Sequence, residues 1–181
     1  MNKLKSKFEK LELSRINLTT LFNSIDEQAL TFKSNPEKWS IVQICFHVIK
    51  SEQLTVLVLN KNLQLKDDLK KSGFLGIIRD HSLRFALKSK IKFRAPAIVA
   101  NPPETYDFQE LMKKWETIRI SLKTYLDNFP EKYLQKEINK HPIAGWLNLP
   151  QTLNFLQNHF DHHKLQIEKR IKEYNILNNN K

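Results

Sequence analysis

Glycine, cysteine and long apolar runs are all scarce in this sequence, and each scarcity excludes a class of protein. Three glycines occur among 181 residues. Phosphate-binding loops of the GxGxxG and GxxxxGK types need two or three glycines at short spacing, so neither type can be written anywhere in the chain. Nucleotide binding through a glycine-rich loop is therefore excluded.

The lone cysteine, Cys45, cannot form an intramolecular disulfide, and residues 1–20 carry charge without an apolar segment or a small-residue cleavage site. Secretion is therefore not expected. Lys, Asp, Glu or Asn interrupts every apolar stretch before it reaches about 18 residues, so no membrane span is expected either. We expect a soluble, cytoplasmic protein.

Basic residues outnumber acidic ones, with 30 Lys and Arg against 19 Asp and Glu. Such an excess suits a polyanionic partner, because Lys and Arg displace counterions from phosphates. Lysine supplies 24 of the 30, however, spread along the chain and interleaved with acidic residues, and no basic cluster is paired with aromatic side chains for stacking. A solvated surface is the preferred interpretation, and nucleic acid is not expected as a partner. Any anion-attracting surface should lie in the segment 61–94, which holds ten Lys and Arg.

Apolar residues recur with the 3.6-residue period of helices over four long stretches. Two of these stretches begin with a capping arrangement, Ser40 with Gln43 and Asp107 with Glu110. The first predicted helix runs from Phe8 through Ile25 and ends before Asn35-Pro36. The other three run from 41 to near 60, from 107 to 129, and from 150 to near 174.

The region between the second and third of these helices is less regular. An amphipathic helix is predicted over 74–91, and Pro96, Pro102 and Pro103 force an extended connector after it. Together the elements predict an all-α fold, a four-helix bundle with a long crossover segment that carries an additional short helix. We expect one domain over residues 1–177 and a polar tail over 178–181.

Two histidines on the last predicted helix, His159 and His163, are four residues apart and therefore lie on one face. That face also carries the apolar seam of the helix, so both imidazoles point toward the core. Two neutral imidazoles at this spacing can clamp a metal ion, as in helical HExxH zinc sites. The glutamate of that motif is absent here, and HExxH protease chemistry is not supported.

A third ligand is needed, and His47 is the candidate because it lies in the middle of an otherwise apolar helix, where an imidazole needs a partner. A core histidine bonded to a side chain or water is the alternative for His47. His162 and His81 are expected at the surface. His141, just before Pro142, could cap a helix, line a pocket or add a ligand, and the sequence does not decide among these.

Several of these residues resemble the DinB-like superfamily of four-helix-bundle proteins, which includes bacillithiol- and mycothiol-dependent S-transferases. The resemblance rests on Trp39-Ser40 opening a helix, His47 within it, the loop from His141-Pro142 to Leu147, and His159-x-x-x-His163-x-x-Gln166, and it covers roughly residues 10 to 172. It implies a divalent metal, most often zinc or nickel, held by His47, His159 and His163. Manganese and iron are further candidates.

Three neutral imidazoles leave the charge of a divalent ion uncompensated and leave coordination positions open, as in catalytic sites. The resemblance implies transfer of the sulfur of a low-molecular-weight thiol to a small electrophile, with metal-assisted hydrolysis as the next alternative. Glu52 and Gln166 are candidates to orient the imidazoles, and ordinary surface polarity is an equal alternative for both. Cys45 lies on an apolar helix and is not expected to act as a nucleophile.

Two hypotheses from other classes stay open. In one, a metal-binding or metal-free bundle acts through protein contacts and the histidines are structural. In the other, the 61–94 surface binds an anion. A small-molecule substrate is the expected partner; bundles of this type often form homodimers, but the sequence specifies no interface.

Overall fold

The computed structural model describes residues 2–64, 69–72, 97–142 and 144–178. Its helices and strands are α1 (Asn2–Phe22), α2 (Glu27–Thr31), α3 (Ile41–Gln64), α5 (Ala97–Ala100), α6 (Phe108–Asp127), the 3-10 helix η2 (Glu131–Tyr133), β1 (Asn139–His141), β2 (Gly145–Leu147) and α7 (Leu149–Asn178). The predicted helix over 74–91, His81 and most of the basic segment 61–94 lie outside the described residues.

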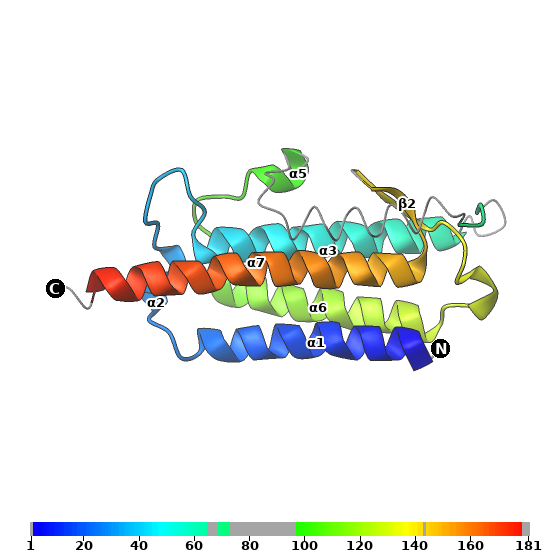
Figure 1. The fold of residues 1–181 in the computed structure, drawn as a ribbon, viewed down its shortest axis with the longest axis horizontal. Coiled ribbons are helices and arrows are strands. Elements are labelled where there is room, and N and C mark those ends of the chain that lie inside the picture. The colour runs from blue at the N-terminus through cyan, green and yellow to red at the C-terminus, as the bar shows by residue number, and fades with distance from the viewer. Residues whose placement is uncertain (1, 65–68, 73–96, 143, 179–181) are drawn as a thin grey trace.

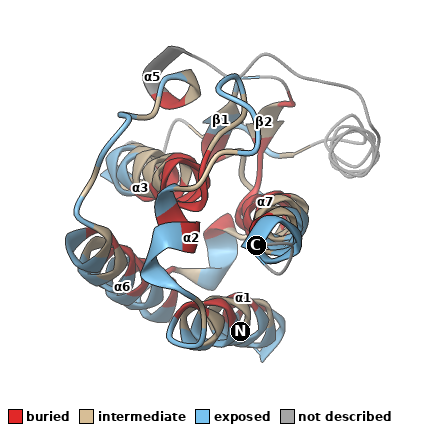
Figure 2. Cartoon of the chain, turned by 90° about the vertical axis from the view of Figure 1, so that its left-hand side faces the viewer, coloured by how far each residue is buried: buried red, intermediate tan, exposed pale blue. Residues whose placement is uncertain are grey.

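Four long helices, α1, α3, α6 and α7, lie side by side along the length of the molecule (Figure 1). In the end-on view of Figure 2 they form a ring in which α3 packs against α6 and α7, and α1 packs against the same two helices. Buried residues face the inside of this ring. The all-α four-helix bundle predicted from the sequence is confirmed.

The neighbours α3 and α6 run in the same direction. Gln43 bonds to Pro103 just before α6, and Glu52, further along α3, bonds to Arg119 further along α6. The chain between two parallel helices has to return along the bundle, which requires the long crossover that was predicted. The short helix α5 lies in this crossover, beside α3.

Side-chain caps determine where the long helices begin. At α3, the Gln43 N–H donates to Ser40 Oγ at 3.3 Å and the Ser40 N–H donates to Gln43 Oε1 at 3.1 Å, which is the predicted capping box. At α6, Asp107 accepts from the Glu110 N–H at 2.9 Å, also as predicted. A second reciprocal capping box, which was not predicted, opens α7 between Asn148 and Gln151.

The first helix ends earlier than predicted. The structure ends α1 at Phe22 and begins α2 at Glu27, whereas the apolar pattern predicted one helix through Ile25. The physical reason is Asp26, whose extended backbone and side chain cap α2 by accepting from the Gln28 N–H at 2.9 Å. A cap residue cannot also continue the preceding helix.

The predicted loop before the last helix contains a two-stranded antiparallel hairpin. Strand β1 pairs with β2 so that Asn139 faces Leu147 and His141 faces Gly145. Gly145 has a φ of 71°, in the left-handed region that favours glycine. The Ala144 N–H donates to His141 Nδ1 at 3.0 Å and closes the turn between the strands.

Helix α3 is the most apolar of the four long helices. Among the described residues it is the one helix long and apolar enough to cross a membrane by length and composition. Of its most apolar window 61% is buried inside the bundle, as is common for the core helix of a soluble protein. Fully buried side chains from all four long helices pack together, including Leu11, Ile41, Ile44, Leu59, Trp115, Leu122, Leu153 and Phe160.

Candidate metal centre

Three histidines from two neighbouring helices meet inside the bundle. His47 comes from the middle of α3, and His159 and His163 come from successive turns of α7. All three side chains are buried, with 5% to 8% of their surface exposed. The antiparallel packing of α3 against α7 therefore brings the three residues named by the sequence pattern to one place.

The rings present the same nitrogen to one another. His159 Nε2 lies 3.1 Å from His47 Nε2 and 3.2 Å from His163 Nε2. One ligand atom from each ring lies within 4.8 Å of the other two. The cluster consists of histidines alone, with no carboxylate within the described part of the chain belonging to it.

Hydrogen bonds behind two of the rings fix their tautomers. His47 Nδ1 lies 2.7 Å from the Val99 carbonyl oxygen of α5, which can only accept, so Nδ1 carries the hydrogen and Nε2 of a neutral ring keeps its lone pair. His163 Nδ1 lies 3.0 Å from Gln166 Oε1, and with the amide in this orientation the hydrogen of His163 is on Nδ1 as well. Partners of this kind orient metal-binding imidazoles and raise their basicity.

Hydrogen bonding among the three rings cannot satisfy all three Nε2 atoms. The lone pairs of His47 and His163 both face His159, whose Nε2 carries one hydrogen at most. One buried acceptor is therefore left without a donor in the cluster, which is unfavourable. A cation between the rings would satisfy all three.

The spacing of the nitrogens fits a divalent ion. An ion bound at 2.0–2.1 Å by nitrogens in tetrahedral directions separates those nitrogens by about 3.3 Å. The separations of His159 Nε2 from His47 Nε2 and from His163 Nε2, 3.1 and 3.2 Å, are close to that value. The donor set and its spacing together mean that the cluster could hold a metal ion.

Burial keeps all three imidazoles neutral. It lowers the pKa of His47 and holds the pKa of His159 well below its usual range, with further lowering from the neighbouring histidines. It lowers the pKa of His163 to about 3. Since a protonated imidazole cannot bind a metal, these shifts keep the ligands available throughout the neutral pH range.

Aromatic rings surround the cluster. The Trp39 ring lies 5.2 Å from the His47 ring, and Phe155 stacks on His159 with the ring centroids 5.4 Å apart. Trp39 is held in place by Arg170 on α7, which donates to its carbonyl oxygen at 2.9 Å. This packing contributes to the burial of both imidazoles and restricts their rotation.

His141 lies near the cluster without joining it. Its ring is 4.4 Å from Phe155, on which His159 stacks, and its Nδ1 is used by the hairpin turn. Burial lowers the pKa of His141 to about 4. Of the roles that the sequence left open, the structure places His141 in a turn cap beside the histidine cluster.

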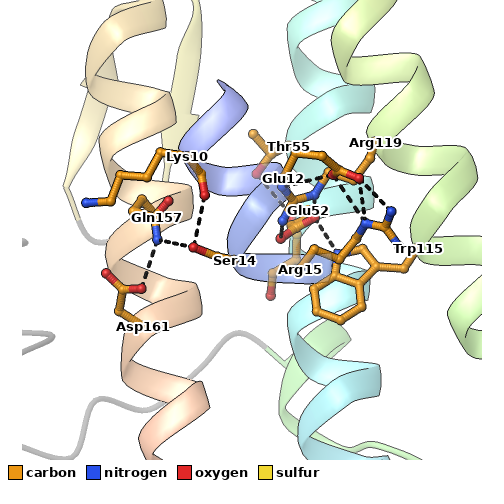
Figure 3. Close-up of polar contacts among 11 residues, drawn as sticks. Lys10, Glu12, Ser14, Arg15, Glu52, Thr55, Trp115, Arg119, Gln157 and Asp161 are labelled. Atoms are coloured by element: carbon orange, nitrogen blue, oxygen red, sulfur yellow. Dashed lines mark hydrogen bonds and ion pairs between the residues drawn. The ribbon is translucent and has the colours of Figure 1, made fainter. Parts of the chain in front are cut away.

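Glu52 has a different place from the one considered in the sequence analysis. Its carboxylate accepts from Arg119 at 2.7 and 2.8 Å and from the Trp115 indole at 2.8 Å, and none of its bonds is to His47, His159 or His163. Figure 3 shows this group between α3, α6 and α1, where Glu12 also faces Arg119. Glu52 therefore joins helices and does not orient an imidazole.

Cys45 has the role that the sequence predicted, whereas the contact of Val99 was not predicted. Burial strongly raises the pKa of the Cys45 thiol, in keeping with its expected role as an apolar packing residue. The Val99 carbonyl, in contrast, was not anticipated as a partner of His47. A backbone carbonyl leaves no mark in the side-chain pattern, so no sequence signal could have identified it.

Comparison with known protein families gives one match that covers most of the chain. Residues 10–167 match the family described as the DinB superfamily, a range that contains the three histidines and Gln166. No curated protein and no solved structure matches the chain at a significant level.

Proposed function

Since the chain belongs to the DinB superfamily, we propose that it is a metal-dependent enzyme whose divalent ion is held by His47, His159 and His163. The observation that carries the proposal is the convergence of three buried Nε2 atoms, two of them with lone pairs fixed by Val99 and Gln166. Zinc and nickel are the first candidates because imidazole suits both, and manganese and iron follow.

The neutral ligand set supports a catalytic role. When bound, a divalent ion with open positions lowers the pKa of a coordinated thiol or water, so that thiolate or hydroxide is available near neutral pH. The histidines leave the charge of the ion uncompensated, which strengthens this effect. Val99 and Gln166 hold two of the rings in the binding tautomer, and Phe155 and Trp39 exclude water from two sides.

We propose thiol transfer as the reaction, because the sequence resembles thiol-dependent S-transferases. The thiol of a low-molecular-weight cosubstrate loses its proton to solvent, and its sulfur forms a bond to carbon of a small electrophile. The bond from that carbon to the leaving group breaks, and the leaving group departs with the electron pair and takes up a proton. We place this reaction in the cytoplasm, where such thiols are kept reduced.

Metal content is the first test. We expect untagged protein, incubated with Zn, Ni, Mn or Fe and then freed of excess ion, to hold about one metal per chain. His47→Ala, His159→Ala and His163→Ala should each weaken binding at least about tenfold, because each removes one of three ligands. Asn158→Ala is the matched control, since Asn158 is half-buried on α7 beside His159 and no ligand is lost.

Elemental analysis and titration calorimetry give the measurement, and circular dichroism checks that each variant folds. A wild type that stays empty with every metal, or alanine variants that bind as well as it does, would contradict the proposal. Metal-loaded protein is then incubated with a thiol and an electrophile, and mass spectrometry of the products distinguishes S-transfer from hydrolysis. A thioether product supports S-transfer, a hydrolysed electrophile indicates a hydrolase, and no product with either indicates a bundle without catalysis.

A further inference from the structure

Two backbone carbonyls of the crossover accept hydrogen bonds from two side chains of α3. The Val99 carbonyl oxygen lies 2.7 Å from His47 Nδ1, and the Pro103 carbonyl oxygen accepts from Gln43 Nε2 at 3.3 Å. The two donors are four residues apart and therefore share one face of α3. The two acceptors are also four residues apart, in the opposite order. The segment 97–106 thus runs antiparallel to α3 and is tied to it at two points, one of which is a histidine of the cluster.

Backbone groups fix the orientation of the buried Gln43 amide. Its Oε1 accepts at 3.1 Å from the Ser40 N–H, which can only donate, and its NH₂ group faces the Pro103 carbonyl, which can only accept. The reversed amide would bring two donors together at Ser40 and two acceptors together at Pro103. The pKa of the Glu104 carboxyl is lowered by Lys33 and further by the Gln43 amide, which also places the NH₂ group toward this segment.

Prolines make the segment stiff between its two contacts. The residues that follow Val99 are Ala100, Asn101, Pro102 and Pro103. Each proline ring fixes its own φ, and the residue before a proline is restricted to extended conformations. Few conformations are therefore open to residues 101–103, and fixing the Pro103 carbonyl limits where the Val99 carbonyl can lie.

The Val99 carbonyl decides which nitrogen of His47 carries hydrogen. A carbonyl only accepts, so the hydrogen is on Nδ1 and the lone pair of Nε2 faces His159 Nε2 at 3.1 Å. Water in place of the carbonyl accepts and donates equally well, and it would allow the hydrogen to move to Nε2, where it can donate to His159. A ring in that tautomer cannot bind a metal through Nε2.

We propose that Gln43 is a positioning residue for the histidine cluster, which ties the segment 97–106 to α3 and thereby keeps the Val99 carbonyl on His47 Nδ1. Water can replace the amide at the exposed Pro103 carbonyl, but water does not tie that carbonyl to α3. For its effect on metal affinity the inference rests on the proposed function. The tautomer of His47 is a property of the metal-free protein and can be tested without any metal.

The first experiment is nitrogen NMR of ¹⁵N-histidine-labelled, metal-free protein. Gln43→Met has a similar volume and removes the bond to Pro103, but it also removes one bond of the capping box. Ser40→Ala is the matched control, because it removes the other bond of the box and keeps the Gln43 amide. We expect the hydrogen of His47 on Nδ1 in the wild type and in Ser40→Ala, and a measurable fraction on Nε2 in Gln43→Met.

Circular dichroism checks that each variant folds. If Gln43→Met does not fold, Gln43→Glu takes its place, because an ionised carboxylate still accepts from the Ser40 N–H and offers no donor to Pro103. Hydrogen on Nε2 of His47 in the wild type, or an unchanged tautomer in the Gln43 variant, would overturn the proposal. An equal shift in Ser40→Ala would also overturn it, since the start of α3 and not the segment 97–106 would then set the tautomer.

The second experiment is titration calorimetry of metal binding. Losing a hydrogen-bond partner behind a metal ligand costs about 10–100-fold in affinity. Gln43 acts one step further out than Val99, so Gln43→Met should weaken binding by roughly 3–10-fold, near the lower bound of that range. Ser40→Ala should change it by less than about twofold, because the partner of His47 stays in place.

Equal losses in the two variants would show that the effect comes from the start of α3, and no loss in Gln43→Met would show that Gln43 has no role. Either result overturns the proposal. A wild type that binds no metal would instead contradict the proposed function, and the NMR result would still decide whether Gln43 sets the tautomer of His47.

Discussion

At the scale of single residues, burial of histidines makes the stability of the protein depend on pH. The pKa of His141 in the folded state is about 4, below the usual value of 6.5. As pH falls below 6.5, the unfolded chain binds a proton at this residue and the folded protein does not until about pH 4. The free energy of unfolding therefore decreases between these pH values, and the three clustered histidines act in the same direction.

His141→Asn tests this prediction, because Asn offers an acceptor for the Ala144 N–H and does not titrate. In metal-free protein, we expect the free energy of unfolding to fall less steeply with decreasing pH in the variant, by about 1.2 kcal/mol per pH unit between pH 6 and 4.5. Urea unfolding at several pH values measures the slopes, and the difference above pH 7.5 should not vary with pH. Parallel curves for both proteins would contradict the prediction.

The three histidines of the cluster were readable from the sequence, whereas their hydrogen-bond partners were readable only in part. His159, His163 and Gln166 fall on one helix, so helical spacing predicted their proximity. His47 is distant in sequence, and its polarity within an apolar helix was the signal. For Glu52 on the same helix the sequence left open an imidazole-orienting role or ordinary surface polarity, and the structure instead buries it with Arg119 of α6 as its partner. Polarity shows that a buried group needs a partner and does not show which one.

At the scale of helices, a buried ion pair connects α3 to α6. The side chains of Glu52 and Arg119 are each 2% exposed and lie 2.7 Å apart. We expect Arg119→Met to lower the free energy of unfolding by about 3–5 kcal/mol, because it leaves the Glu52 carboxylate buried without its counter-ion. Adding Glu52→Leu should recover most of the loss, since a well-packed apolar pair can replace a buried ion pair.

Chemical denaturation of the three proteins measures these differences. Lys123→Met is the matched control, because it breaks an ion pair on the same helix between side chains that are 61% and 60% exposed. Its effect should stay below about 0.5 kcal/mol. If the double variant were as unstable as Arg119→Met, the loss would not come from an unpaired Glu52 carboxylate. If Arg119→Met were as stable as the wild type, the buried ion pair would not contribute to stability. Either result would contradict the prediction.

Helix boundaries were predictable where a side-chain cap and the start of an apolar pattern coincide. They were not predictable where the apolar pattern continues past a residue that caps a new helix. Ser40 and Asp107 gave correct starts for α3 and α6. The apolar pattern continued through Ile25, while the cap at Asp26 ended any continuous helix there. The hairpin of β1 and β2 was missed because three-residue strands are too short for alternation to be recognised.

At the scale of the whole molecule, a bound metal should stabilise the fold. The two helices that supply the ligands come together only in the folded chain, so the binding free energy adds to folding stability. At a free metal concentration 100 times the Kd, the gain is about 2.7 kcal/mol, and for a domain of this size that raises Tm by roughly 5–10 °C. We expect this shift with zinc or nickel and its reversal by a chelator.

Thermal unfolding followed by circular dichroism measures the shift. His163→Ala should show little of it at the same metal concentration, because one ligand is missing. A shift of equal size in the variant would mean that the stabilising ion binds elsewhere.

The overall topology was the most predictable level of organisation. Four periodic apolar stretches and a long proline-containing segment between the second and third were enough to predict a bundle with a crossover. The sequence did not predict that the crossover also contacts the histidine cluster, where the Val99 carbonyl holds His47. This contact joins residues 52 positions apart and depends on how the crossover packs.

The parallel packing of α1 and α7 has a consequence for mechanical strength. Lys7 bonds to Asn154 and Ser14 to Gln157, so the two helices run in the same direction, and the two ends of the chain lie at opposite ends of the bundle (Figure 1). A force applied to both ends therefore pulls these neighbours past each other along their length. Their contacts share the load and have to break together, whereas helices pulled from the same end would separate one turn at a time. Force applied end to end therefore loads the contact between α1 and α7 in shear along its whole length.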